Sequence, residues 1–315
     1  MKKLHIVPAD TSVDFIGKRL AAFILSAMLI VLSLGLFLGQ GLNLGIDFLG
    51  GILIEVKTEG PADVGGMRST LGQLGLGDVS LQEFGEADVV LIRVQRQEGG
   101  DVAQQEAVRT VKDALAGTVA EYRRTETVGP TVGEELKEAA FWAVLAAIGA
   151  MLAYIWFRFE WQFGVAAVVA LLHDVISTVG LFSVLQLEFN LATVAAILTI
   201  AGYSINDTVV VFDRVRENLR KYKKLPIADL LNLSINSTLS RTVMTSLTTL
   251  LALGSLYFLG GEVIRGFSVA LIWGVLIGTY SSIALAVPLL LYLKVYRGTG
   301  EEDAGPSGAE AEGAG

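Results

Sequence analysis

Six long apolar segments constrain the fold of this chain more than any other feature of its sequence. Four of them carry no charged side chain, and each is close to the ~20 residues that a helix needs to cross the hydrocarbon core of a bilayer. With 52% hydrophobic residues, the chain is more apolar than ordinary soluble domains. The sequence therefore predicts a polytopic α-helical membrane protein with six transmembrane helices, at residues 20–39, 139–157, 163–187, 189–212, 242–259 and 267–293. The first is expected to be a retained helix, because its apolar stretch is longer than that of a cleavable signal peptide.

The distribution of Lys and Arg predicts how these helices are oriented. If the N-terminus lies inside, the inner segments carry fourteen Lys and Arg residues, whereas the short outer loops carry only Arg265. The positive-inside rule then places both termini in the cytoplasm. Four cytoplasmic segments are expected: an N-terminus at 1–19, a turn at 158–162, a connection at 213–241 and a tail at 294–315. The connection is basic and then amphipathic, which is typical of a membrane surface, and the tail has a composition typical of disorder.

The long outer loop, residues 40–138, is patterned like a folded domain. It holds seventeen acidic and nine basic residues and so accounts for the whole net charge of −8. Alternating and β-branched stretches predict strands, helical periods predict helices, and a turn is expected at 85–88. The predicted order is β 51–58, α 62–74, β 78–83, β 89–95, α 102–115 and β 118–128. This is the βαββαβ order of an extracytoplasmic ferredoxin-like α+β domain; an irregular solvated loop is the alternative.

Asp207 occupies an unusual position inside the apolar segment 189–212. Four apolar residues follow it, which leaves the carboxylate roughly 6–9 Å from the end of the segment at ~1.5 Å per residue. A carboxylate at that depth costs at least a few kcal/mol, and such groups commonly bind ions or protons. Ser204 lies on the same helical face and Asn206 is adjacent, so we include both as proton-transport candidates. The alternative is a helix-end residue that reaches the headgroups.

Arg241 begins the next span, which is antiparallel to the span of Asp207 and joined to it on the inside. The two side chains can therefore lie at the same height. An arginine favours the charged form of a buried carboxylate, and desolvation favours the neutral form. A carboxylate that alternates between these environments would bind and release a proton; a static ion pair is the alternative.

Asp174 lies about eleven residues from either end of its span, next to His173. It is either a group on a proton path or a structural hydrogen-bonding group. The sequence contains no cysteine and two histidines, so thiol chemistry and disulfides are excluded and a histidine-based metal site is not expected. A nucleotide-binding glycine motif is also missing, and an enzyme is not expected.

Five motifs carry a resemblance to a known family. They are Gly45–Gly51 (GIDFLGG), Val128–Gly133 (VGPTVG), Leu172–Asp174 (LHD), Tyr203–Asn218 (YSINDTVVVFDRVREN) and Ser240–Leu250 (SRTVMTSLTTL). The chain resembles the SecF family of the SecD–SecF complex, which is attached to the bacterial protein translocon and is similar to the resistance-nodulation-division transporters.

The resemblance implies an auxiliary subunit of protein export that uses the proton-motive force together with SecD. It implies Asp207 as the proton-titrating group and Arg241 as its partner, with the proton as coupling ion and no other cofactor. Expected partners are SecD, the SecYEG channel, YajC and YidC, an unfolded preprotein outside and membrane lipid, but no nucleic acid.

Two motifs that flank the outer domain are hinge candidates, because glycine can take unusual dihedrals; ordinary turn chemistry is the alternative. Their residues are Asp47, Phe48, Gly50, Gly51, Gly129, Pro130 and Gly133. Two other functions stay open: a non-transporting assembly subunit that bridges SecD and the channel, and a small-molecule exporter, which would usually have twelve spans.

Overall fold

Six helices in this computed structural model, which describes residues 12–295, are long and apolar enough to cross a membrane. The prediction of six spans is confirmed. Lys2, Lys3 and almost all of the predicted tail lie outside the described residues. The spans are α1 (Arg19–Gln40), α5 (Pro130–Arg158), α6 (Trp161–Leu185), α7 (Leu191–Lys221), α8 (Ile227–Leu259) and a composite sixth. The sixth consists of α9 (Arg265–Ser281), a π turn (Ser282–Ala286) and α10 (Val287–Tyr292).

The connection predicted at 213–241 is mostly helical. α7 continues to Lys221, and α8 already begins at Ile227. The amphipathic half was expected at the membrane surface, but Leu230, Leu231 and Ile235 are fully buried in the core of the bundle. The amphipathic pattern indicated that these three apolar side chains contact lipid. In the structure they contact other helices instead.

Close packing in the centre of the bundle depends on small residues. α6, α7 and α9 are its most buried helices, and Phe159, Phe163 and Phe212 form a cluster of tilted and edge-to-face rings at one end. Near the middle, a Cβ added to Gly278 would lie 3.2 Å from the Cβ of Ser204, so α9 approaches α7 closely there. Small residues at such contacts let membrane helices approach each other.

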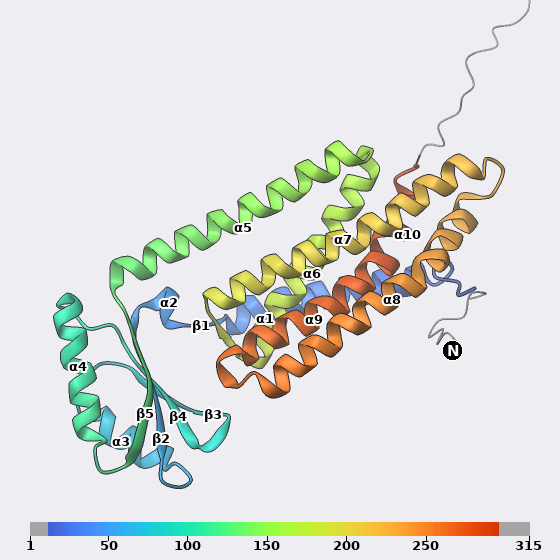
Figure 1. Cartoon of the computed structure of the whole chain (residues 1–315). Helices are drawn as coiled ribbons and strands as arrows, with labels where there is room; N and C mark the ends of the chain where they lie inside the picture. The colour runs from blue at the N-terminus through green and yellow to red at the C-terminus, as the bar shows by residue number, and fades with distance from the viewer. Residues whose placement is uncertain (1–11, 296–315) are drawn as a thin grey trace, which may run out of the picture.

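The segment between α1 and α5 contains the expected α+β domain, which lies beyond one end of the helical bundle (Figure 1). Its elements are β2 (Gly51–Thr58), α3 (Val64–Gly72), β3 (Val79–Phe84), β4 (Glu86–Val94), α4 (Gly100–Ala114) and β5 (Val119–Val128). The sheet is antiparallel with the order β3-β4-β2-β5. The predicted turn at 85–88 is tighter than expected, because β4 starts at Glu86 and leaves only Gly85, at φ 80°, between the strands.

Two short elements join the outer domain to the bundle. β1 (Asn43–Leu44) pairs in parallel with β6 (Glu188–Phe189), which connects α6 to α7. α2 (Ile46–Leu49) follows and leads directly into β2. Figure 1 shows β1 and α2 between the sheet and the near ends of the bundle helices. At the far end, Arg19 of α1 donates a hydrogen bond to the Tyr292 hydroxyl of α10 (3.2 Å), so the first and last spans meet there.

Candidate functional site

Asp207 lies in the interior of the bundle, where two hydroxyl groups from other helices bind it. Its side chain is only 9% exposed. Thr242 of α8 donates a hydrogen bond to Oδ1 (2.8 Å), and Ser282 of the π turn donates to Oδ2. The hydrogen-bond partners of this carboxyl group are therefore neutral hydroxyl groups. They stabilise the charged carboxylate, and because they carry no positive charge they also allow it to bind a proton.

Asp174 on α6 is a second carboxyl group in the same core, and it is fully buried. Ser204 of α7 and Ser281 of α9 both donate to its Oδ2, at 2.5 and 2.7 Å. The Nδ1 atom of His173 lies 2.9 Å from its Oδ1, and the Nε2 atom of His173 forms no hydrogen bond with any described residue. Ser204, which the sequence placed on the face of Asp207, therefore donates to Asp174 and not to Asp207.

Two adjacent serines connect these carboxylates to one point of the sixth span. Ser281 donates to Asp174 and Ser282 donates to Asp207. Ser282 is also the first residue of the π turn, and π turns inside helices often occur at functional sites. A proton placed on either carboxyl group would change hydrogen bonding at the same helical turn.

Neither Arg241 nor Asn206 forms a hydrogen bond or ion pair with the two carboxylates within residues 12–295. The Arg241 side chain is exposed, and within residues 12–295 it forms no ion pair with Asp207 at 4.0 Å or less, although its charge acts on the carboxylate from further away. The direct contact belongs instead to its neighbour Thr242. Asn206 is exposed as well.

Sequence reasoning missed Thr242, Ser281 and Ser282 as partners of the two carboxylates. The available indication was the Ser281-Ser282 pair in a span without charged residues. A further polar chain runs beside the site, from the Tyr203 hydroxyl to Ser246 (3.3 Å) and from Ser246 to Thr279 (2.6 Å). No group of three metal-ligating side chains occurs in the described part of the chain.

The joint between the outer domain and the bundle is the second candidate region. Asp47 accepts a hydrogen bond from the backbone N–H of Leu191 (2.9 Å), the first residue of α7. A carboxylate at a helix N-terminus is stabilised by the unpaired N–H groups and the helix dipole. The buried Phe48 ring lies 6.0 Å from the ring of Phe189. Both residues therefore fix the start of α7 to the segment that enters the sheet.

The glycines of the two flanking motifs differ in role. Gly50 and Gly51 have φ of 71° and 119°, in the region that favours glycine. A Cβ on Gly51 would also lie 2.6 Å from the Val94 carbonyl oxygen. Gly129 has ordinary extended dihedrals and precedes Pro130, the first residue of α5, and Gly133 packs closely against α2. Unusual dihedrals thus occur at the first motif and not at Gly129 or Gly133.

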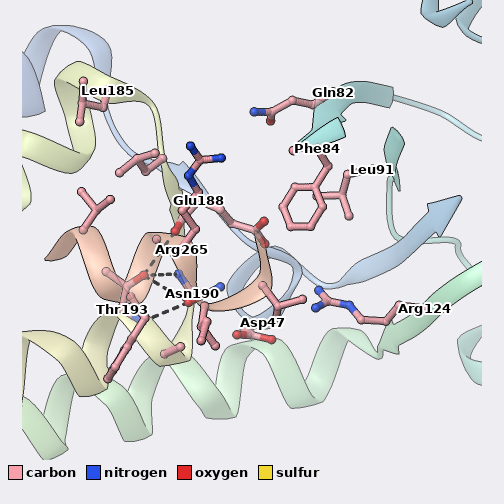
Figure 2. A pocket seen from close by; sticks show the side chains of 18 of the residues that line it. Asp47, Gln82, Phe84, Leu91, Arg124, Leu185, Glu188, Asn190, Thr193 and Arg265 are labelled. Atoms are coloured by element: carbon pink, nitrogen blue, oxygen red, sulfur yellow. Dashed lines mark hydrogen bonds between the residues drawn. The ribbon is translucent and has the colours of Figure 1, made fainter. Parts of the chain in front are cut away.

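A pair of charged side chains bridges the same joint. Arg93 of β4 contacts Glu188 of β6 at 2.7 Å and donates to the Asn43 side chain at 2.9 Å. A cavity of about 820 Å³ lies beside them, between the sheet and the ends of the bundle helices. Figure 2 shows Phe84 and Leu91 of the sheet on one side of it and, on the other, Asn190, which caps α7, and Thr193 of α7.

The comparisons with known proteins agree with this architecture. The family described as "Protein export membrane protein SecD/SecF, C-terminal" matches residues 109–296, and the family described as "SecD/SecF GG Motif" matches residues 35–62. The first match covers more than half of the chain.

The chain belongs to the SecD/SecF family. It is 49% identical to the protein translocase subunit SecF of Rhodobacter capsulatus over 96% of this chain and 95% of that protein. It is 50% identical to the SecF subunit of Magnetococcus marinus, over 90% of this chain and 92% of that protein. Membership in the SecD/SecF family makes it a multi-pass membrane protein of protein transport and not an enzyme.

A solved structure of the SecD/SecF family has the same fold. The crystal structure of SecDF, a translocon-associated membrane protein from Thermus thermophilus, matches with a TM-score of 0.84 and 39% identity. The match covers 92% of this chain but only 40% of that longer chain. The six helices and the small α+β domain between the first two are thus common to both, and the family implies a SecD partner for this chain.

Proposed function

We propose that this chain is the SecF-type subunit of a SecD–SecF complex that uses the proton-motive force to promote preprotein translocation. The observation that carries the proposal is Asp207, a carboxyl group buried in a membrane-spanning helix and bound, among residues 12–295, only by hydroxyl donors at hydrogen-bond distance. Intramembrane carboxyl groups are costly and usually functional. In this proposal Asp207 takes up and releases the coupling proton, and Asp174 is a second carboxyl group on the path.

In this proposal the positive charge of Arg241 acts on the Asp207 carboxylate from a distance, without direct contact. Its neighbour Thr242 contacts Asp207 and Arg241 itself is exposed, so a rotation of α8 about its axis would exchange the two partners. Adjacent residues differ by about 100° around a helix with 3.6 residues per turn. Such an exchange would alternate a neutral partner and a cation at the carboxylate.

The energy available is sufficient for small movements of a docked domain. One proton that moves through 100 mV releases about 2.3 kcal/mol. That is comparable to one or two charge-assisted hydrogen bonds, such as those that hold the outer domain at Arg93. The orientation with both termini in the cytoplasm is part of the proposal, as are hinge movement at Gly50 and Gly51 and contacts with SecYEG, YajC, YidC and an emerging preprotein.

The test is an export assay with SecD in vesicles, with and without an imposed proton-motive force. Asp207→Asn keeps the shape of the side chain but removes the proton-binding group. Because loss of a proton-transfer group usually lowers a rate by more than tenfold, we expect force-dependent export to fall at least about tenfold. Asp229→Asn is the matched control, because it makes the same chemical change at an exposed carboxylate in the first turn of α8.

The second candidate function is an assembly subunit that only holds SecD at the channel. It would be favoured if Asp207→Asn assembles with SecD and keeps force-dependent export near the wild-type level. Arg241→Ala separates the two carboxylate partners: loss of export in this variant with normal assembly supports the exchange of Thr242 and Arg241.

A further inference from the structure

We propose that a pocket between the end of α5 and the last turns of α7 binds the headgroup of an anionic phospholipid through its phosphodiester groups. The pocket has a volume of about 570 Å³ and is lined by charged side chains: Arg158, Asp213, Arg216, Glu217, Arg220 and Lys221. Its volume is within the ~300–1,000 Å³ of small-molecule sites. Its lining on α7 begins at Asp213, six residues or about 9 Å along the helix from Asp207, and it takes no part in the proposed proton chemistry.

The lining residues of α7 form one face of the helix. Asp213, Arg216, Glu217 and Arg220 are spaced at i, i+3, i+4 and i+7, which places them in a single row. Arg158 is the last residue of α5 and faces this row, since its guanidinium lies 2.7 Å from the Asp213 carboxylate. The charged side chains at the ends of α5 and α7 therefore line the same pocket.

Two of the guanidinium groups are held in place before any ligand arrives. Arg158 and Arg216 both lie over the ring of Phe159, at 5.0 and 5.5 Å from its centroid. Arg216 also donates a hydrogen bond to the Arg158 backbone carbonyl (3.1 Å). Arginine has five N–H donors in a fixed fork, so both retain donors for phosphate oxygens. Pre-ordered side chains lower the entropic cost of binding.

The charges of the pocket are not balanced by its own carboxylates. Asp213 pairs with Arg158, and Glu217 pairs with Arg214, which does not line the pocket. Within residues 12–295, the remaining three cations, Arg216, Arg220 and Lys221, have no carboxylate at 4.0 Å or less. Several cations that converge without counter-charges favour an anion, and planar guanidinium groups suit phosphate in particular.

The position of the pocket favours a lipid as the source of that phosphate. The last turn of α5 carries Trp156 and Phe157, and α6 begins with Trp161; these side chains are 73%, 91% and 56% exposed. Exposed aromatic residues next to a charged helix end mark the level of the headgroups. Basic pockets between membrane helices are known to hold phosphate headgroups, and acyl chains would run along α5, whose membrane span is largely unburied.

The surplus of positive charge selects among lipids. Three unpaired cations exceed what one phosphodiester neutralises, so a headgroup with two phosphodiesters, as in cardiolipin, is expected to bind more tightly than phosphatidylglycerol. Phosphatidylcholine, whose headgroup has no net charge, is expected not to bind.

The experiment uses the full-length chain with SecD, purified and reconstituted into phosphatidylcholine nanodiscs that contain a minor fraction of either cardiolipin or phosphatidylglycerol. Native mass spectrometry measures the lipid that stays bound. The test variant is Arg216→Gln with Arg220→Gln. The control variant is Lys223→Gln with Lys224→Gln, which removes the same charge from the same connection outside the pocket.

We expect retained cardiolipin with wild type and control, and an affinity roughly thirtyfold lower in the test variant, the effect of two basic groups near anionic lipid. If both variants lost cardiolipin affinity equally, the binding would depend on general surface charge and not on the pocket, and the proposal would be overturned. Displacement by inorganic phosphate would show a free-phosphate site instead. If the chain bound the lipid alone but not in complex with SecD, the pocket would be a contact surface for SecD and not a lipid site. Both of these results would also overturn it.

Discussion

The ion pair between Arg93 and Glu188 is expected to control how firmly the outer domain docks on the bundle. Arg93 contacts Glu188 at 2.7 Å and Asn43 at 2.9 Å, and the two charged side chains are 18% and 23% exposed. Exposed ion pairs contribute about 0.2–1 kcal/mol, whereas hydrogen bonds to charged groups contribute about 1.5–3 kcal/mol. For a pair that is about four-fifths buried, we take about 1.5 kcal/mol, which is about a tenfold change in the docking equilibrium.

The perturbation is Glu188→Gln, which removes the charge and keeps the size of the side chain. The assay is hydrogen exchange measured by mass spectrometry on the full chain in nanodiscs. The backbone N–H of Gly45 donates to the Phe189 carbonyl across the joint (2.9 Å), so its exchange requires the joint to open. Exchange of this amide is expected to become about ten times faster, because its rate follows the population of the open state.

A control at the same cavity separates docking from general charge effects. Glu126→Gln makes the same chemical change next to the same cavity, but the partner of Glu126 is Arg124 on the same strand (3.3 Å). This variant should leave exchange at Gly45 unchanged. If Glu188→Gln changes that exchange by less than about twofold, or if the control matches it, the ion pair does not hold the domain and the reasoning fails.

Three further predictions concern the helix ends, the core and the outer sheet. Asp47→Ala removes the acceptor for the first amide of α7 and should cost about 1 kcal/mol, seen as roughly fivefold faster exchange in the first turn of that helix only. Gly180→Ala would place a Cβ 2.7 Å from the Ser33 Cα, so overpacking of about 1–3 kcal/mol should lower the thermal unfolding midpoint, and Ser33→Gly should restore only part because that Cα remains. In the outer sheet, the hydrogen bond from Lys57 lowers the pKa of Asp88, and Asp88 raises the pKa of Lys57. Their pairing should therefore stabilise the outer domain between about pH 4 and pH 10, and this stabilisation should be lost below and above that range. In Asp88→Asn the thermal unfolding midpoint should no longer depend on pH through this pair.

Local patterns were sufficient to predict the outer domain. The predicted strand at 51–58 has the bounds of β2, because alternation and β-branched side chains identify a strand without reference to its neighbours. Helix ends in the bundle were harder to predict. A count of apolar residues stops at the first charged cluster, whereas α8 extends fifteen residues before 242, since only the tertiary contacts of Leu230 and Ile235 decide that this stretch is buried.

The site shows the same limit at the level of single side chains. A carboxylate in an apolar span is visible in the sequence, so Asp207 and Asp174 could be found. Their partners could not, because serine and threonine are common in membrane helices and hydrogen-bond to their own backbone as readily. Arg241 was chosen for its charge, yet Thr242, about 100° further around the helix, makes the contact.

The π turn at Ser282–Ala286 distinguishes the sixth span from the other five, which contain no π turn within residues 12–295. A π turn accommodates one residue more than an α turn, so the span contains a single surplus residue at the level of both carboxylates. Such a surplus can pass along a helix turn by turn, with only a few backbone hydrogen bonds exchanged at each step. Each step re-registers the side chains it passes while both ends of the helix stay still. If the surplus residue shifted along the sixth span, the hydroxyl groups that face the two carboxyl groups would change without any sliding of the helix as a whole.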